Sequence, residues 1–178
     1  GATLTGFNTI KVIDFSHLCD SSYNFIADIA ELDLQNCLNL SYAFSNSNYN
    51  IATGTGVGIG NWNVSKVTNF FACFENSEFN QVLNWTTTAG EIYSYMFRNN
   101  KIFNQPLTNF NFASAITTEK MFLGSEAFNQ DLSTKRFNKC MNFDFMFYNA
   151  LAYANRVMSL WLADSTKTGI SHIGFLKH

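Results

Sequence analysis

The segment Trp62-Asn63-Val64-Ser65-Lys66-Val67-Thr68-Asn69-Phe70-Phe71-Ala72-Cys73-Phe74 decides the fold. We number the positions of this pattern from Trp62, which is position 0, so that Phe74 stands at position +12. Apolar side chains fall at positions 0, +2, +5, +8 and +12, and the same spacing recurs along the chain. A unit this short cannot bury its own apolar face, so the pattern predicts that neighbouring units stack on one another.

Position +12 is the most regular column of the repeat. In chain order it holds Cys19, Phe44, Phe74, Phe97, Phe122 and Phe147, at intervals of 25, 30, 23, 25 and 25 residues. A second motif, an aromatic residue followed by Asn and Gln, comes after it in three units, at Phe79-Asn80-Gln81, Phe103-Asn104-Gln105 and Phe128-Asn129-Gln130. Two independent columns with one period predict about six stacked units.

The local pattern predicts the structure of each unit. Residues 64–69 alternate and are partly β-branched, which favours a short strand, and Tyr95-Met96-Phe97 and its equivalents suggest one turn of helix. Parallel strands would place successive units about 4.8 Å apart, within the range of about 4.5–7 Å that stacked aromatic rings prefer. We therefore expect a repeat solenoid of short parallel strands and short helical turns.

The repeat also sets the expected domain boundaries. The solenoid should span residues 1–157, and residues 158–178, where the pattern fails, should form a C-terminal cap or a docking tail. The predicted units lie near residues 7–31, 32–61, 62–84, 85–109, 110–134 and 135–157. The longest interval contains Gly54-Thr55-Gly56-Val57-Gly58-Ile59-Gly60, which we interpret as a flexible insertion.

Three stretches resemble a known family: Phe103-Asn104-Gln105-Pro106-Leu107, Phe128-Asn129-Gln130-Asp131-Leu132 and Trp62 to Asn69, with Met-Phe pairs at 96–97, 121–122 and 146–147. They resemble the repeats of BspA-like leucine-rich-repeat surface proteins, in particular mycoplasma-type surface lipoproteins. The resemblance spans roughly residues 7 to 157. It implies a leucine-rich-repeat-like solenoid outside a cell, used for adhesion to a protein or glycan on a host or neighbouring cell, and it implies no chemistry.

Composition excludes some classes of partner. Charged residues make up 13% of the chain, the net charge is −2 and the pI is about 5.9. This balance gives no basic surface for nucleic acid or for an anionic membrane. No apolar stretch approaches the length of a membrane span.

Candidate catalytic and cofactor motifs have simpler interpretations. The glycines between Gly54 and Gly60 resemble a phosphate loop, but Trp62 begins a repeat strand where a nucleotide site needs a helix. Asp14, Ser16 and His17 suggest a nucleophile with its base, yet residues adjacent on one strand point to opposite sides. His17, His172 and His178 lack metal-ligand spacing. We therefore expect a protein that is not an enzyme, with no cofactor, metal or catalytic residue.

The four cysteines occupy positions that other units fill with apolar residues. Cys37 and Cys140 share a column but lie four units apart, and Cys19 and Cys73 lie two units apart. Both separations exceed the Cα distance of about 7 Å that a disulfide allows. We expect four free, buried thiols that act as small hydrophobic groups.

Position +7 is rich in Asn, which favours a structural role in satisfying backbone groups over ligand binding. If positions +5 and +7 point inward, then positions +4 and +6 point outward, because strand side chains alternate. The outward positions give a candidate binding stripe of Lys11, Ile13, Leu38, Lys66, Thr68, Glu91, Ile116 and Met141. Exposed apolar stripes often mark protein contacts, although an adjacent segment or the 158–178 tail would also explain an apolar row here.

Two functions therefore remain open from the sequence. The first is a non-enzymatic binding protein on an extracellular surface. The second is a structural subunit of a fibre, appendage or virus particle, joined by self-association through the open ends of the stack.

Overall fold

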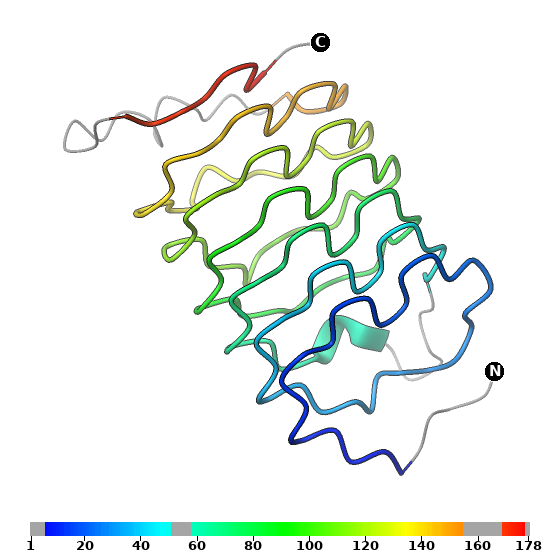
Figure 1. Ribbon diagram of the computed structural model, residues 1–178. Helices are drawn as coiled ribbons and strands as arrows, with labels where there is room; N and C mark the ends of the chain where they lie inside the picture. Colours follow the sequence, from blue (N-terminus) through cyan, green and yellow to red (C-terminus); the bar gives the residue numbers. More distant parts are fainter. Residues whose placement is uncertain (1–5, 51–57, 155–168, 177–178) are drawn as a thin grey trace.

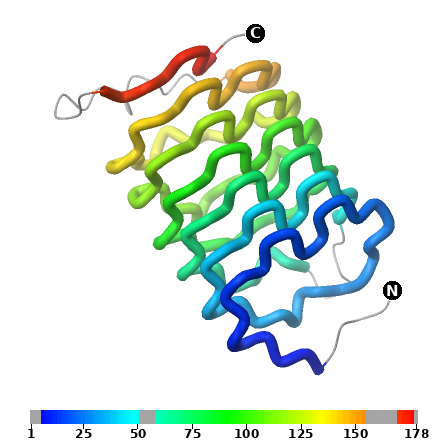
Figure 2. The backbone as a smooth tube through the Cα atoms, in the orientation of Figure 1, coloured from blue at the N-terminus to red at the C-terminus, as the bar shows by residue number. Residues whose placement is uncertain are grey.

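The computed structural model describes residues 6–50, 58–154 and 169–176. Within these ranges the one helix is the 3-10 helix η1, Gly58–Asn61, and no extended strand forms. The rest of the described chain runs in turns and bends. It winds into successive coils that lie one above another, with the first coil at one end and residues 169–176 at the other (Figure 1). Figure 2 follows the same path as a smooth tube through the Cα atoms.

Backbone hydrogen bonds join each coil to the next. Every coil contributes the residue at position +7 to an isolated parallel bridge, and these residues follow the intervals of the sequence repeat: Asp14–Asn39, Asn39–Asn69, Asn69–Ile92, Ile92–Thr117, Thr117–Asn142 and Asn142–Ser171. Beyond each bridge, alternate amides continue the ladder. The N–H groups of Phe70, Ala72, Phe74 and Asn76 donate to the carbonyls of Ile92, Ser94, Met96 and Arg98 at 2.8–3.0 Å.

Left-handed residues replace the predicted helical turns. Position +10 has a positive φ in all six coils, as at Ala72 (52°) and Tyr95 (64°), and position +14 repeats this, as at Asn76 (51°). The amide of Cys73 donates to the carbonyl of Phe70 at 3.2 Å, which closes a turn with its third residue left-handed. A helix requires consecutive residues with negative φ. The prediction of helical turns was therefore wrong, and the predicted strands are reduced to single bridges.

Columns of stacked aromatic rings fill the interior, and two of them adjoin each other. Position +12 supplies Phe44, Phe74, Phe97, Phe122 and Phe147, all fully buried, and their ring centroids follow one another at 5.3, 5.4, 5.5 and 5.4 Å. The predicted burial of this column is confirmed. The second motif supplies an adjoining column, in which Phe103 and Phe128 lie 4.1 and 4.0 Å from the +12 rings of their own coils. The described residues thus enclose a large aromatic core built from contacts between coils.

The Asn of the second motif links the coils on the surface. The Oδ1 atom of Asn104 accepts the backbone N–H of Asn129 at 3.0 Å and the Nε2 group of Gln130 at 2.8 Å. One coil earlier, Asn80 accepts the equivalent bonds from Asn104 and Gln105 at 3.0 and 3.1 Å. These Asn residues therefore satisfy backbone groups of the next coil, and the arrangement explains why Gln follows Asn in the motif.

The C-terminal segment adds a further turn to the stack. Residues 158–168 and 177–178 of the predicted cap lie outside the described residues. Residues 169–176 pair with the coil before them, because the amides of Phe143, Phe145 and Phe147 donate to the carbonyls of Ser171, Ile173 and Phe175 at 2.8, 2.8 and 3.0 Å. Phe175 is buried against the core. This part of the segment therefore covers the end of the stack and leaves the candidate stripe uncovered.

Candidate binding face

The eight residues of the candidate stripe lie on the outside of the coils. The aliphatic side chains are the most informative, since Ile13, Leu38 and Ile116 are 58%, 45% and 49% exposed. Met141 is also exposed, as are Lys11, Lys66 and Glu91, while Thr68 is half-buried. Position +5 is buried from the second coil onward, in agreement with the predicted alternation. We call these eight residues the aliphatic stripe.

Position +7 does not point into the interior, so that part of the prediction was wrong. Asp14 is exposed and the equivalent residues of the other coils are half-buried. The Oδ1 atoms of Asn39 and Asn69 accept the backbone N–H groups of Ser41 and Phe71, each at 3.0 Å. Side chains that bond the backbone two residues ahead must stay beside it at the surface. The expected role of these Asn residues, hydrogen bonding to backbone groups, is therefore confirmed, but their side chains do not point into the interior as expected.

A row of ring and cation contacts runs beside position +7. It consists of His17, Tyr42, Phe71, Tyr95, Lys120 and Phe145, and we call it the aromatic ladder. The rings of His17 and Tyr42 stack at 4.8 Å with an angle of 12° between their planes. The centroid distances from Phe71 to Tyr42 and to Tyr95 are 5.3 and 5.2 Å. One ladder thus crosses the stack from the first coil to the last full one.

Lys120 takes the place of an aromatic ring in the ladder. Its Nζ atom lies 5.0 Å from the ring centroid of Tyr95 and 5.7 Å from that of Phe145, which is the geometry of a cation–π contact on each side. The same atom donates to Glu119 at 2.7 Å and to the Tyr95 hydroxyl at 2.9 Å. The hydrogen bond with Glu119, and then that with Tyr95, raise the pKa of Lys120. The cation in this slot is therefore held by its neighbours.

The ladder ends against a glycine. A Cβ atom on Gly174 would lie 2.6 Å from the ring of Phe145, and Gly174 has a φ of +59°. Both the close approach and the left-handed backbone favour glycine at this position. The upper face of the Phe145 ring is therefore covered by backbone.

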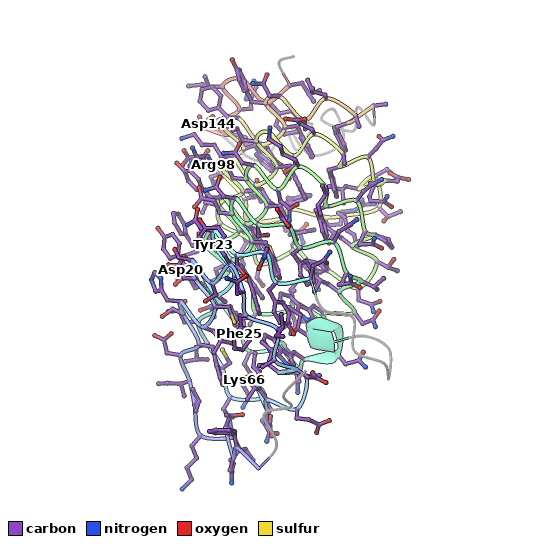
Figure 3. All side chains as sticks on the ribbon, turned by 90° about the vertical axis from the view of Figure 1, so that its right-hand side faces the viewer. Asp20, Tyr23, Phe25, Lys66, Arg98 and Asp144 are labelled. Carbon is purple, nitrogen blue, oxygen red and sulfur yellow. The ribbon has the colours of Figure 1, made fainter. Side chains whose placement is uncertain are left out.

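Charged groups flank the ladder. The Nη1 atom of Arg98 donates to Glu75 at 2.7 Å, and the Arg98 guanidinium lies 5.4 Å from the Tyr95 ring centroid. Asp20, Arg98 and Asp144 belong to three different coils and lie along one side of the stack (Figure 3). The polar row at position +7 adjoins the ladder, because the ladder residue Phe71 donates its backbone N–H to Asn69 Oδ1 at 3.0 Å. The candidate binding face comprises the aliphatic stripe, this polar row and the ladder.

The structure separates the residues that suggested nucleophilic chemistry. His17 Nδ1 lies 2.8 Å from Asp20 Oδ2, and Ser16 donates its backbone N–H to Asp14 Oδ1 at 2.8 Å. That N–H and the Ser16 hydroxyl lower the pKa of Asp14. Histidine and serine therefore face different carboxylates. Among the described residues no group of three or more His, Cys, Asp and Glu side chains is arranged to hold a metal ion.

All four cysteines are buried thiols outside any disulfide, as predicted. Burial raises the pKa of Cys19 to about 12 and that of Cys37 to about 11, and it raises the pKa of Cys73 as well. The glycine insertion lies mostly outside the described residues, except that Gly58–Asn61 form η1. In the ranges described, no helix has the length and hydropathy of a membrane span.

The aromatic ladder was missed from the sequence. Position +10 reads His17, Tyr42, Ala72, Tyr95, Lys120 and Phe145, so aromatic residues do recur there. Two features hide the row. The third coil supplies its ring from position +9, at Phe71, and the helical turn expected at position +10 gives a different direction for these side chains.

The fold and its face define a class of protein with stacked coils, an aromatic interior and a long lateral face. The chain belongs to the family described as Mycoplasma protein of unknown function, DUF285, whose model matches residues 2–52 and 47–161. No curated protein and no solved structure matches the chain.

Proposed function

We propose that this chain is a non-enzymatic surface protein that binds a protein or glycan of a host or neighbouring cell through its lateral face. The coils would form a leucine-rich-repeat-like solenoid of the BspA-like kind, displayed outside the cell. The observation that carries the proposal is the row of exposed aliphatic side chains at Ile13, Leu38, Ile116 and Met141. Apolar rows on an otherwise polar surface often mark contacts between proteins.

The ladder favours a protein partner over a glycan. A sugar ring packs on an aromatic side chain through the open face of that side chain. The faces of Tyr42 and Tyr95 are turned toward neighbours in the ladder, and Gly174 covers one face of Phe145. The groups left for a partner to contact are the edges of the rings and the polar row at position +7. Edges, amides and aliphatic groups suit the side chains and backbone of another protein.

The paired charges beside the ladder support a partner that is selected by short-range contacts and is not attracted over long distances. Glu75 pairs with Arg98, and Glu119 pairs with Lys120, so the charges beside the ladder are largely neutralised within the face. Such pairs add little stability when they are exposed. A paired charge can still exclude partners that place a like charge opposite it. We therefore expect binding that depends only weakly on salt.

Binding to intact animal cells tests the proposal. Fluorescently labelled protein should bind cells saturably by flow cytometry, and the Leu38→Lys/Ile116→Lys double variant should lose this binding while it keeps its melting temperature. The matched control is Val82→Lys/Ile102→Lys, which alters two residues of similar exposure (41% and 43%) outside the face. A double variant on the stripe that binds like the control would contradict the proposal. Protease treatment of the cells then separates a protein partner from a glycan.

A further inference from the structure

Lys135 stands at position 0, where the three coils before it place aromatic rings. Trp62 and Trp85 stack at a centroid distance of 6.4 Å, and Trp85 and Phe110 at 6.3 Å. In the next coil the Lys135 Nζ atom donates to the backbone carbonyls of Thr108 and Phe110 at 2.8 and 2.9 Å. A cation therefore follows the last ring of this column.

The charge of Lys135 has no counter-ion among the described residues. Burial lowers the pKa of its ammonium group, and no carboxylate in the described part of the chain forms an ion pair with it. Two of its three N–H groups donate to carbonyls, and the third donates to no acceptor within the same ranges. A partly buried charge without an opposite charge costs free energy. A neutral donor would also satisfy two carbonyls, so these hydrogen bonds alone do not explain a cation at this position.

Arg136 brings a second cation to the same hollow of the surface. The hollow has a volume of about 370 Å³, and its lining apart from Lys135 and Arg136 is uncharged: Thr108, Phe110, Asn111, Phe112 and Thr134. Arg136 Nη1 donates to the carbonyls of Ser133 and Lys135 at 3.5 and 3.2 Å. The Nε and Nη2 groups of Arg136 donate to no acceptor among the described residues, and they form the fork that binds a carboxylate through two hydrogen bonds. This hollow therefore combines two cations with an open guanidinium fork.

A second hollow adjoins the first and suits hydroxyl groups. The two hollows share Thr108, Thr134 and Lys135, and the second has a volume of about 260 Å³. It adds the Gln130 amide and the Asp131 carboxylate to the lining. A carboxylate repels an anion but accepts hydrogen bonds from hydroxyl groups, as the oxygen of an amide does. The pair of hollows therefore offers one place for an anionic group and an adjacent place for hydroxyls.

We propose that the groove between residues 106–112 and residues 130–136 binds an acidic sugar, a hydroxylated ring that carries a carboxylate. The carboxylate would lie between Lys135 and Arg136, and ring hydroxyls would donate to Asp131 and Gln130. The larger hollow, at about 370 Å³, falls within the range of about 300–1,000 Å³ of small-ligand sites. Counted from position 0 of each coil, the groove uses positions −5 to +2, whereas the lateral face uses positions +4 to +10. This inference therefore does not rest on the proposed function of the lateral face.

An NMR titration of isotope-labelled protein with glucuronate tests the site. Glucuronate should shift the amide signals of residues 106–112 and 130–136 saturably, whereas glucose, which lacks the carboxylate, should leave them in place at the same concentration. Lys135→Met and Arg136→Gln should each weaken glucuronate binding by about tenfold, since each removes a charged hydrogen-bond donor. Arg136 is exposed, so its variant decides the question if Lys135→Met does not fold. The matched control is Lys139→Gln, which removes an exposed charge of the same coil outside the groove and should bind like the wild type. Equal shifts with glucose, or wild-type affinity in Arg136→Gln, would overturn the proposal.

A comparison with glutarate tests whether the groove recognises the sugar ring as well as its charge. Glutarate carries carboxylates without ring hydroxyls, so it should bind about tenfold more weakly than glucuronate. Asp131→Asn changes the repulsion felt by both ligands, but only glucuronate loses a hydroxyl contact with the carboxylate. The ratio of the two affinities should therefore fall in this variant. Equal affinities in the wild type, or a ratio that Asp131→Asn leaves unchanged, would reduce the groove to a site for any small anion and overturn the assignment of a sugar.

Discussion

The rings of Phe97 and Phe122 lie parallel, with an angle of 3° between their planes and 5.5 Å between their centroids. They come from consecutive coils, and neither ring is exposed to solvent. The spacing is close to the rise of about 4.8 Å between paired strands, with the small excess due to an offset of the rings. The hydrogen-bonded spacing between coils therefore sets the spacing of the rings in the aromatic column.

Replacement of Phe122 by Ala should destabilise the protein by about 3–5 kcal/mol, the usual cost of deleting a buried Phe. The side chain contacts Phe97, Phe128 and Phe147, so the cavity would open in the middle of both aromatic columns. Urea unfolding followed by circular dichroism measures the change. The control is Ile102→Ala, at a side chain that is 43% exposed, which should shift stability by less than about 0.5 kcal/mol. Equal midpoints for the two variants would contradict the column as the core.

Asn104→Ala should destabilise the protein by about 0.5–1.5 kcal/mol, the usual net value of a hydrogen bond. The substitution removes the acceptor for Asn129 N–H and one of two acceptors for Gln130 Nε2, which also donates to the Asn104 backbone carbonyl at 3.0 Å. Asn104→Asp keeps that acceptor, so it should retain most of the stability at neutral pH. Thermal unfolding of the three proteins distinguishes the cases. If Ala and Asp were equivalent, the side-chain link between coils would have no energetic role.

Ala72→Gly should leave the stability of the protein unchanged or raise it slightly, whereas Ala→Gly at most buried positions lowers stability. Ala72 has a φ of 52°, a conformation that costs an L-residue about 1–2 kcal/mol and costs glycine little. Relief of this strain offsets the extra entropy that glycine gains on unfolding, about 0.4–1 kcal/mol. Ala115 is equally buried without a positive φ, so Ala115→Gly should destabilise the protein. Equal losses at the two sites, measured by urea unfolding, would show that the left-handed turn carries no strain.

The core was predictable from the sequence because it depends on a column that is nearly invariant within this chain. The residue type and regular spacing of Phe74, Phe97 and Phe122 predict their burial, and this prediction does not depend on the conformation of the backbone between them. The backbone was not predictable in the same way. Tyr95 and Lys120 are left-handed although neither residue type favours that conformation, because hydrogen bonds to the next coil impose it. The aromatic ladder depends on those φ angles, so it could not be located before they were known.

The buried thiols should react slowly in the folded protein. Burial raises the pKa of Cys37 to about 11, so at pH 8 almost no reactive thiolate is present. We expect four thiols to react with an aromatic disulfide reagent in denaturant, and a rate in native buffer that follows the unfolding rate. Fast reaction of any thiol without denaturant would show that its coil opens locally.

Stability should fall as the pH rises above the ordinary pKa of a thiol. The pKa of Cys19 is raised by burial to about 12, so the unfolded chain releases its proton at a lower pH than the folded protein does. The unfolded state then binds fewer protons, and the free energy of unfolding decreases from about pH 9 until the folded thiol itself ionises. Below pH 8 both states keep the proton and this contribution is constant. Melting temperatures at pH 7.5 and 10 measure the effect, with Cys19→Ala as the comparison, because other groups titrate over the same range. The variant should start from a lower melting temperature, since it lacks a buried sulfur, and should lose less on going to pH 10. An equal loss in the two proteins would mean that Cys19 is already in contact with water in the folded state.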